Sequence, residues 1–572
     1  MNKRQKQRRT QKRGGSLRRL LGLFIIAAAV YWVVFYVMPN RLHMDPDWKG
    51  MDKPLFVKGI LTDYSAAGTG ENLLLPLPFL QEYVDSSIRA EKESKSVILS
   101  TDSELLHMQT DTTKAHLNNK PVQLRLAPEE IGGLTYLPAE TLKNLYGIEI
   151  QEDKETGAVQ IMLAGESVPL GKVKGKKGGK EVALRSEATI HAPIRADMSP
   201  GTIVKIWKKS DKWLYVQMSN GFTGYVKNDD ILSKGQKVVK AQKLTPSRAE
   251  RSWSGKPINL VWEAVYERKP NPKTIGKIPG INVVSPTWFR IVDGEGNVRS
   301  QADRAYVQWA HQQGIEVWGL LSNSFEADMT TVALSTYEKR MRTIVQMLEY
   351  CDLYDLDGIN IDFESVHTKD GDNVTQFMRE LKPMAQAKNL IVSIDVTPKS
   401  NSELWSLFLD RRSLGTIADF IIIMAYDEHW ASSPVAGSVA SLSWVENSVS
   451  RIIEEDDVSP EKIILGVPLY TRIWSETKVE GKNKVSSKAV SMDAVTEIIK
   501  SKKLKPKFDQ STGQNYVAYI EDGVPRKIWI EDKVSLKARV QLAKSFGLGG
   551  VGSWNRSFAN SEAWKALNEI HK

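Results

Sequence analysis

Apolar runs and amphipathic stretches alternate along the C-terminal half of the chain. The runs have the length of buried strands, and the stretches between most of them show apolar residues at helical spacing, as at 336–350, 374–387 and 536–546. Eight strands that alternate with helices predict a (β/α)8 TIM barrel over residues 255–572. The expected strands lie at 258–265, 281–288, 315–321, 358–364, 390–396, 420–426, 463–469 and 549–554.

The interval between the seventh and eighth expected strands is longer than the others. Residues 475–527 are mostly polar there and become strand-like at 516–520. We therefore expect a small α+β insertion in the barrel over about residues 475–527.

A weak internal repeat precedes the barrel. Residues 73–99 and 134–162 each contain a short apolar strand, a proline (Pro76 or Pro138), a short amphipathic helix and an alternating strand. This pattern predicts a small α+β module over 71–165, and it resembles the N-terminal module of copper amine oxidases. No His or Cys cluster accompanies it, so we expect no copper there and interpret the module as a spacer.

A small all-β unit is predicted over residues 181–235, after a Gly- and Lys-rich linker at 166–180. Its motifs resemble bacterial Src-homology-3-like domains, and this resemblance implies that the unit grips cell-wall peptide or glycan. The alternative is a barrel with a buried Trp213 and no ligand. The matching residues are Leu184, Arg185, Gly201, Trp213, Val216, Gly224, Tyr225 and Val226.

The N-terminal segment predicts a membrane anchor. Residues 20–38 contain no charged residue, and nineteen helical residues rise about 28 Å, close to the hydrocarbon thickness of a bilayer. We therefore expect a cytoplasmic basic arm over 1–19, a single-pass transmembrane helix over 20–38 and a stalk over 39–70. The remaining domains, including the catalytic domain, would then be extracytoplasmic. A cleaved signal peptide is the alternative, although its apolar core is usually shorter.

The charge distribution argues against a nucleic-acid partner. The chain has a net charge of +10, but nine cationic residues and no acidic residue lie within residues 1–40. The body of the protein is therefore almost neutral. Cys351 is the single cysteine, so no internal disulfide forms, and its place in an apolar helical run predicts a buried structural side chain.

The fourth expected strand ends in a polar motif at residues 357–364, Asp-Gly-Ile-Asn-Ile-Asp-Phe-Glu. Side chains alternate across a strand, so Asn360, Asp362 and Glu364 share one face and the apolar residues between them take the other. Burying two carboxyl groups and an amide costs several kcal/mol unless they are paired. We therefore expect the polar face to point into the barrel mouth, where barrel enzymes carry their catalytic residues.

This octapeptide resembles the signature Asp-Gly-x-Asp-x-Asp-x-Glu of family 18 glycoside hydrolases. Further segments resemble that family in the same order along the chain: Met-Ala-Tyr-Asp at 424–427, Gly-Val-Pro-Leu-Tyr at 466–470 and Gly-Gly-Val-Gly-Ser-Trp at 549–554. The chain is identified as a chitinase-like member of this family, and the resemblance is closest to the branch of peptidoglycan and spore-cortex N-acetylglucosaminidases.

The resemblance implies a retaining hydrolysis in which the acetamido group of the substrate is the nucleophile. It implies that Glu364 is the general acid, that Asp362 holds the acetamido nitrogen, and that Tyr426 donates a hydrogen bond to the acetamido oxygen. The resemblance also implies that Asp427 binds the sugar and that Trp554 forms the floor of the subsite. Motif and strand-end positions add the substrate-binding candidates Asn360, Asp357, Met424, Arg472 and Trp288. Asp395 also ends a strand and is an open candidate.

No cofactor and no metal are expected. His367 and His429 lie near the predicted mouth but lack the spacing of metal ligands, and the hydrolysis needs none.

One residue departs from the family signature, because Asn360 replaces its middle aspartate. Such an asparagine resembles the peptidoglycan branch, and we expect Asn360→Asp to shift the basic limb of the pH–rate profile to higher pH. The expected partner is a cell-wall glycan, with peptidoglycan favoured over chitin oligomers. A glycan-binding protein without turnover is the alternative, as is a structural envelope role for residues 39–240.

Overall fold

The computed structural model describes residues 14–175, 178–240, 253, 255–266, 269–479 and 482–572. The chain forms two compact units. The first comprises residues 1–88, 110–113 and 124–243, and the second comprises residues 89–109, 114–123 and 244–572.

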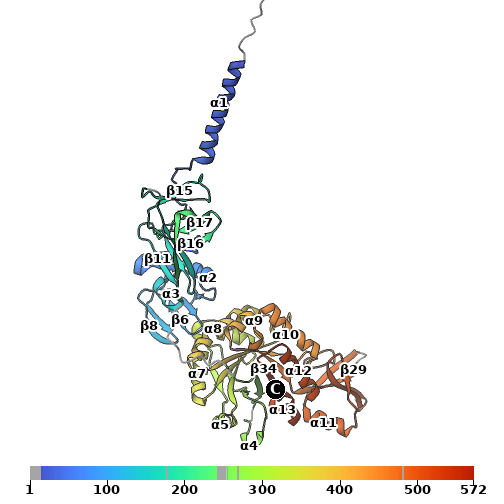
Figure 1. The fold of residues 1–572 in the computed structure, drawn as a ribbon. Coiled ribbons are helices and arrows are strands. Elements are labelled where there is room, and N and C mark those ends of the chain that lie inside the picture. The colour runs from blue at the N-terminus through green and yellow to red at the C-terminus, as the bar shows by residue number, and fades with distance from the viewer. Residues whose placement is uncertain (1–13, 176–177, 241–252, 254, 267–268, 480–481) are drawn as a thin grey trace, which may run out of the picture. The chain divides into compact units, whose positions relative to one another are not determined.

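The second unit contains a closed barrel of eight parallel strands (Figure 1). Neighbouring strands pair in the order β20-β21-β24-β25-β26-β27-β28-β34, and β34 pairs back with β20, which closes the barrel. This confirms the predicted TIM barrel. The strands are β20 (Ile258–Glu263), β21 (Val283–Pro286), β24 (Glu316–Ser322), β25 (Gly358–Asp362), β26 (Ile391–Val396), β27 (Phe420–Met424), β28 (Ile463–Pro468) and β34 (Gly550–Trp554).

Helices surround the barrel, and a short strand pair extends its sheet beside β24. The helices are α4 (Pro272–Ile275), α5 (Arg304–Gln312), α6 (Ala327–Ala333), α7 (Tyr337–Tyr354), α8 (Gly371–Ala387), α9 (Arg411–Ile417), α10 (Leu442–Asp456), α12 (Lys533–Ser545) and α13 (Ser561–Leu567). The extra strands are β22 (Phe289–Ile291) and β23 (Val298–Ser300).

The alternation of side chains on β25 separates two environments. Ile359 and Ile361 are fully buried in the large apolar cluster that the strands form with the surrounding helices, where Cys351 is also buried. The other face of the barrel strands fills the interior with a smaller apolar cluster that includes Trp262 and Trp318. Asn360 and Asp362 lie on this inner face, toward the C-terminal end of the strand.

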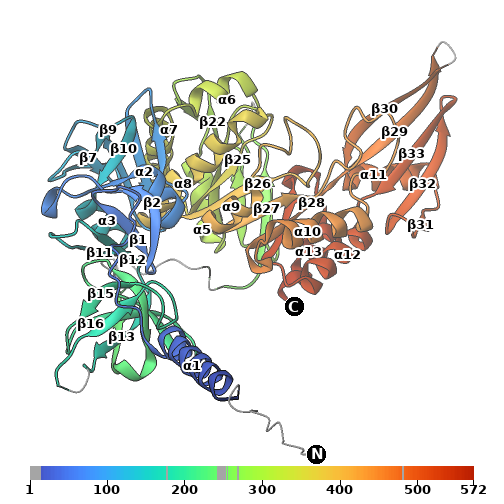
Figure 2. The same cartoon turned by 90° about the horizontal axis from the view of Figure 1, so that it is seen from above.

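A separate sheet follows the seventh barrel strand (Figure 2). Its strands pair in the order β30-β29-β33-β32-β31, and helix α11 (Met492–Ser501) accompanies them. The inserted chain returns to the barrel through α12 and β34. The strands are β29 (Tyr470–Val479), β30 (Lys482–Ser491), β31 (Lys507–Asp509), β32 (Gln514–Glu521) and β33 (Val524–Ile530).

A five-stranded sheet from the predicted α+β module belongs to the barrel unit rather than to the first unit. Ile98 and Leu105 are part of the same apolar cluster as the barrel helices. The ring of His107 stacks on Tyr337 of α7 at 3.8 Å between centroids. The strands are β4 (Arg89–Glu91), β5 (Ser96–Ser100), β6 (Leu105–Gln109), β7 (Lys114–Leu117) and β8 (Lys120–Gln123).

A buried ion triad joins this sheet to the barrel helices. The Arg340 guanidinium of α7 is fully buried and contacts Glu380 of α8 and Glu91 of β4, each at 2.7 Å. A further hydrogen bond, 2.9 Å long, runs from Arg340 to the carbonyl oxygen of Leu334. The two carboxylates and the carbonyl replace the water that the guanidinium loses on burial.

The first unit contains the remaining α+β elements. A four-stranded sheet has the order β11-β12-β1-β2, and a three-stranded sheet has the order β3-β10-β9. The elements are β1 (Pro54–Val57), β2 (Ile60–Ser65), β3 (Leu74–Pro76), α2 (Leu77–Tyr83), β9 (Glu129–Ile131), β10 (Leu134–Pro138), α3 (Ala139–Tyr146), β11 (Glu149–Glu152) and β12 (Val159–Met162). Because β1 pairs in parallel with β12, part of the expected stalk is a structural strand of the module.

The first unit also contains a seven-stranded sheet of order β15-β14-β18-β17-β16-β13-β19. Strand β13 lies within the expected linker and pairs with both β16 and β19, so the start of the linker is an internal strand of this sheet. The strands are β13 (Ser167–Val173), β14 (Val182–Arg185), β15 (Ile194–Met198), β16 (Ile203–Lys209), β17 (Trp213–Gln217), β18 (Thr223–Lys227) and β19 (Ile231–Val238).

The expected transmembrane helix over 20–38, and with it the single-pass membrane location of the protein, is wrong. None of the helices in the described ranges combines the length and the apolar character needed to cross a membrane. Helix α1 (Gly14–Trp32) takes in Arg18 and Arg19, and the apolar residues after it form a separate π-helix (Val33–Val37). Residues 1–13 of the expected basic arm lie outside the described residues.

The ion triad predicts a large effect of Arg340→Met on stability. The substitution leaves Glu380 buried without its cation, and breaking a buried pair in this way costs about 3–5 kcal/mol. Arg342→Met is the matched control on the same helix, because its pair with Glu295 is exposed and should contribute less than about 1 kcal/mol. Urea unfolding followed by tryptophan fluorescence measures the free energy of unfolding of both variants. Equal losses of this free energy would contradict the stabilising role of the buried ion triad.

Candidate active site

The motif that ends β25 brings its carboxyl groups to the barrel mouth. Asp362 is the last residue of the strand and is 7% exposed, and Glu364 follows two residues later. Ser365 then takes a left-handed backbone conformation (φ 53°), which turns the chain away from the strand direction. The carboxyl groups of Asp362 and Glu364 are hydrogen bonded to each other.

Asn323, just after β24, fixes the backbone of Glu364. Its Nδ2 donates to the Glu364 carbonyl oxygen at 2.7 Å, and its Oδ1 accepts from the Glu364 amide at 3.1 Å. Asn323 is fully buried, and the same Nδ2 donates to the Thr330 hydroxyl at 2.9 Å. Sequence reasoning missed this residue, because the only signal for it is an asparagine at the end of the third barrel strand.

The environment of Glu364 raises the pKa of its carboxyl group well above the ordinary value. Burial is the largest cause, followed by the charge of Asp362, the hydrogen bond to Asp362 and the charge of Asp427. Burial also raises the pKa of Asp362, as does the nearby Asp395. Two desolvated carboxyl groups in contact share a proton, so one of them remains an acid near neutral pH.

Tyr426 and Asp427 follow β27, which is separated from β25 by β26 alone. Burial and the charge of Asp395 raise the pKa of Tyr426 well above its ordinary value, so the phenol stays protonated and can donate a hydrogen bond. Asp427 accepts hydrogen bonds from the Tyr470 hydroxyl at 2.5 Å and from Arg472 at 2.8 Å, both at Oδ1. The Asp427 side chain remains 42% exposed.

Trp554 ends the eighth barrel strand and is half-buried, with its ring edge-to-face against Trp262 at 6.0 Å between centroids. A partly exposed indole at a barrel mouth offers a flat apolar surface on which a sugar ring can stack. Asn360 lies one layer deeper and is fully buried. Met424 is also buried, at the end of β27.

Two predicted site residues lie elsewhere. Asp357 precedes β25, at the opposite end of the strand from Glu364, and accepts hydrogen bonds from His311 at 2.8 Å and from the Val317 amide at 2.9 Å. Trp288 is 2% exposed and packs edge-on against Tyr306. The sequence motif and the strand-end position reveal neither burial nor the end of the strand at which a side chain lies, and the roles of Asp357 and Trp288 as substrate contacts stay predictions.

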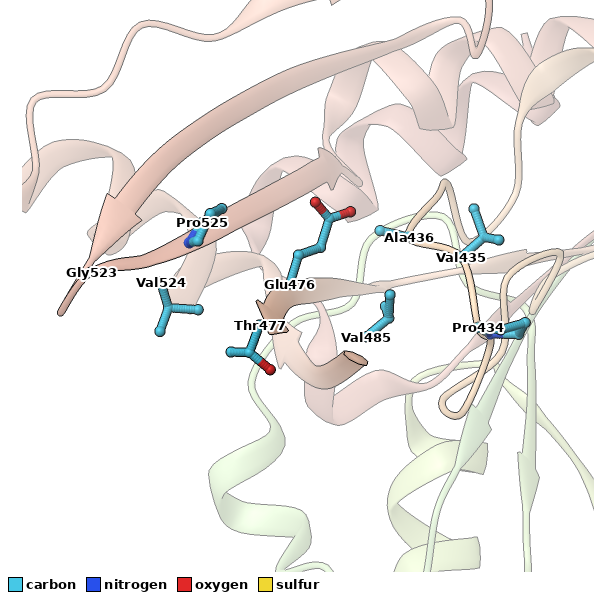
Figure 3. Close-up of a pocket in the computed structure, with 9 residues that line it drawn as sticks. All are labelled: Pro434, Val435, Ala436, Glu476, Thr477, Val485, Gly523, Val524 and Pro525. Carbon is cyan, nitrogen blue, oxygen red and sulfur yellow. The ribbon is translucent and has the colours of Figure 1, made fainter. Parts of the chain in front are cut away.

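A cavity of about 650 Å³ lies beside the insertion (Figure 3). Its walls come from the loop after β27, at Pro434 and Val435, and from the inserted strands, at Glu476, Val524 and Pro525. None of the predicted catalytic residues lines it. Across the described ranges, no group of three or more His, Cys, Asp or Glu side chains is arranged to hold a metal ion.

The desolvated acid predicts that Glu364→Gln stabilises the protein. Folding raises the pKa of Glu364 above its ordinary value of 4.5. The contribution of this group to the free energy of unfolding is therefore complete below pH 4.5 and is lost as the pH rises through the raised pKa. The amide removes this loss, so the melting temperature should rise, and the gain should grow from about pH 5 to about pH 8. Calorimetry with the exposed Glu446→Gln as control checks this, and a gain independent of pH would contradict it.

Three segments of the chain match known families, as their motifs indicated. Residues 323–559 match the glycosyl hydrolases family 18. Residues 57–161 match the copper amine oxidase N-terminal domain, and residues 178–231 match the bacterial SH3 domain.

Curated relatives are similar over about half of the chain. The uncharacterized glycosylase YvbX of Bacillus subtilis (strain 168) is 25% identical over 301 residues, which cover 50% of this chain and 84% of the relative. The cortical fragment-lytic enzyme of Bacillus anthracis is 25% identical over 284 residues, which cover 48% of this chain and 65% of the relative, slightly less than two thirds.

A solved structure has the same fold. The crystal structure of the Bacillus cereus spore cortex-lytic enzyme SleL is 22% identical, with a TM-score of 0.51 over 60% of this chain and 78% of that chain. The matched segment of 323–559 includes the carboxyl pair and the tyrosine at the barrel mouth, so this part of the barrel carries a domain of the glycosyl hydrolases family 18.

Proposed function

We propose that the protein hydrolyses β-1,4 bonds of N-acetylglucosamine-containing cell-wall glycan, with peptidoglycan as the substrate. The observation that carries this proposal is the desolvated carboxyl pair of Asp362 and Glu364 at the open end of the barrel. A protonated carboxyl group beside an ionised one is the arrangement that acid-catalysed cleavage of a glycosidic bond requires.

In the first step, the Glu364 carboxyl donates its proton to the glycosidic oxygen as the bond from that oxygen to C1 breaks. The carbonyl oxygen of the substrate's 2-acetamido group attacks C1 and forms a cyclic oxazolinium. Asp362 accepts the hydrogen bond of the acetamido N–H and balances the positive charge on this ring. The Tyr426 hydroxyl, which stays protonated, donates to the acetamido oxygen and holds it beneath C1.

In the second step, Glu364 accepts a proton from water, whose oxygen attacks C1 and opens the ring. The acetamido group is restored, and the product retains the configuration of the substrate. The two hydrogen bonds from the Asn323 side chain to the Glu364 backbone keep that backbone in place through both proton transfers. Trp554 supplies a stacking surface for the sugar, and the position of Asp427, held by Tyr470 and Arg472, suits a sugar hydroxyl.

Two further observations support peptidoglycan rather than chitin. The cortical fragment-lytic enzyme of Bacillus anthracis carries a name that refers to the spore cortex. Residues 178–231 match the bacterial SH3 domain, which suits a wall-binding role. Chitin oligomers are the alternative substrate, because they present the same acetamido group and the same bond.

Replacement of the acid tests the proposal. In the full-length protein, Glu364→Gln should lower the turnover of purified peptidoglycan by about 10³-fold while binding is retained, because the amide cannot donate the proton. Glu446→Gln, an exposed residue on α10, is the control. Mass spectrometry of the products from peptidoglycan and from chitin oligomers identifies the substrate. Equal turnover by Glu364→Gln and wild type would remove Glu364 from the mechanism.

Removal of the nucleophile from the substrate tests the role of the acetamido group. Wild type should not cleave de-N-acetylated peptidoglycan at detectable rates, because the glucosamine left behind has no carbonyl oxygen to attack C1. Chemical re-acetylation of the same material should restore cleavage. Cleavage of the deacetylated glycan at the original rate would point to a protein carboxylate as the nucleophile.

A further inference from the structure

The orientation of the buried Asn360 amide is determined by its hydrogen-bond partners. The Trp262 Nε1, which can only donate, lies 3.0 Å from the Asn360 Oδ1. The Ser285 hydroxyl donates to the same oxygen, also at 3.0 Å. With its oxygen occupied by two donors, Asn360 must turn its NH2 group in the opposite direction.

The NH2 group of Asn360 meets a carboxylate on the neighbouring strand. Its Nδ2 donates to the Asp395 Oδ1 at 2.8 Å, and Asp395 is 2% exposed on the inner face of β26. Strands β25 and β26 pair in parallel with Asn360 opposite Ser393, which brings Asp395 level with the polar end of β25. The titratable groups around Asp395 are Asp362 and Glu364 from the β25 end and Tyr426 from the β27 end.

We propose that Asp395 is a positioning residue for the catalytic carboxyl pair, and that it supplies from β26 the buried carboxyl group that the family signature carries at position 360. This inference rests on the proposed function, since it concerns the same carboxyl pair. In this chain the side chain of Asn360 is the hydrogen-bond donor, and the accepting carboxyl group is that of Asp395 on the adjacent strand.

The exchange has a consequence for Asp362. Because the Asn360 NH2 group is directed at Asp395, the hydrogen-bond partner of Asp362 is Glu364. Its buried Oδ1 has no partner within the described residues, and this oxygen is available for the acetamido N–H of a substrate. Asp395 therefore acts through Asn360, and it does not touch the reacting atoms.

The same geometry explains why an aspartate at 360 would not suit this chain. A carboxylate there would keep the donors Trp262 and Ser285 on one oxygen and place its other oxygen against Asp395 at about the present 2.8 Å. Two carboxylates at that distance cannot both be ionised, so they would have to share a proton. The pair Asn360–Asp395 avoids this conflict with one charge in place of two.

A charge-swap experiment tests the proposal in the full-length protein. The variants are Asp395→Asn, Asn360→Asp and the double variant with both changes. Ser393→Ala is the control, because its buried hydroxyl lies on the same strand and has no hydrogen-bond partner within the described part of the chain. The measurements are kcat, KM and the pH–rate profile on the substrate of the wild type.

Asp395→Asn should lower kcat by about tenfold or more with little change in KM, as loss of an orienting partner does. It also removes the group that raises the pKa of Asp362, the partner of Glu364, so the proton of the carboxyl pair is held less tightly and the basic limb moves down by about one pH unit. In Asn360→Asp the carboxyl groups at 360 and 395 share a proton, and any loss of that proton at higher pH adds a negative charge near Glu364, so the basic limb should move up. The double variant again has one carboxyl group and one amide at positions 360 and 395. The basic limb of its pH–rate profile should therefore return toward that of wild type.

The outcomes are distinguishable from failure of the proposed function. If Asp395→Asn resembles Ser393→Ala in kcat and in its basic limb, or if the double variant shows no rescue, the inference is overturned while the enzyme activity stands. If wild type cleaves no glycan, the proposed function fails, and the interaction of Asn360 with Asp395 is then tested by the melting temperatures of the same variants. Asn360→Asp should then melt lower, more so at about pH 8 than at about pH 5, and the double variant should recover the loss. A loss without pH dependence or recovery overturns it.

Discussion

A carboxyl group inside an apolar barrel loses its hydration, and the loss must be offset by a proton, a hydrogen bond or a neighbouring charge. The mouth of this barrel holds three such groups on two adjacent strands, and much of the site serves to offset them. Asp362 and Glu364 share a hydrogen bond, while Asp395 receives the Asn360 amide. The interior below them is filled by large apolar side chains such as Trp262 and Trp318, which keep water out and maintain the desolvation.

Much of the fold and of the central motif could be predicted from the sequence, because period-2 alternation is a strong signal when one face is polar. Ile359 and Ile361 identify the outward face of β25, so the inward direction of Asn360 and Asp362 follows from strand geometry alone. The eight apolar runs are separated by helical stretches, and this order has few architectures other than a barrel. The family motifs then agree in position with the strand ends.

Other features depend on tertiary contacts that a linear pattern does not contain. Asn323 holds Glu364 from a strand 41 residues away, and nothing in its local sequence distinguishes it from a loop asparagine. Trp288 and Asp357 occupy strand ends or motif positions, yet packing buries one, and the other lies at the opposite end of its strand. Strand β13 could not be recognised in the sequence, because glycines and lysines typical of a linker follow it. The apolar segment at 20–38 is divided between two helical elements.

The shared core of the β4–β8 sheet and the barrel has a consequence for synthesis on the ribosome. Residues 89–123 emerge early, but the apolar side chains of Ile98 and Leu105 are covered by a cluster that includes residues of α7 and α8. Glu91 likewise meets its cation only when Arg340 has been translated. Domains usually fold in order from the N-terminus as they emerge. Here the apolar face of this sheet stays uncovered until more than 200 residues of later chain have been translated.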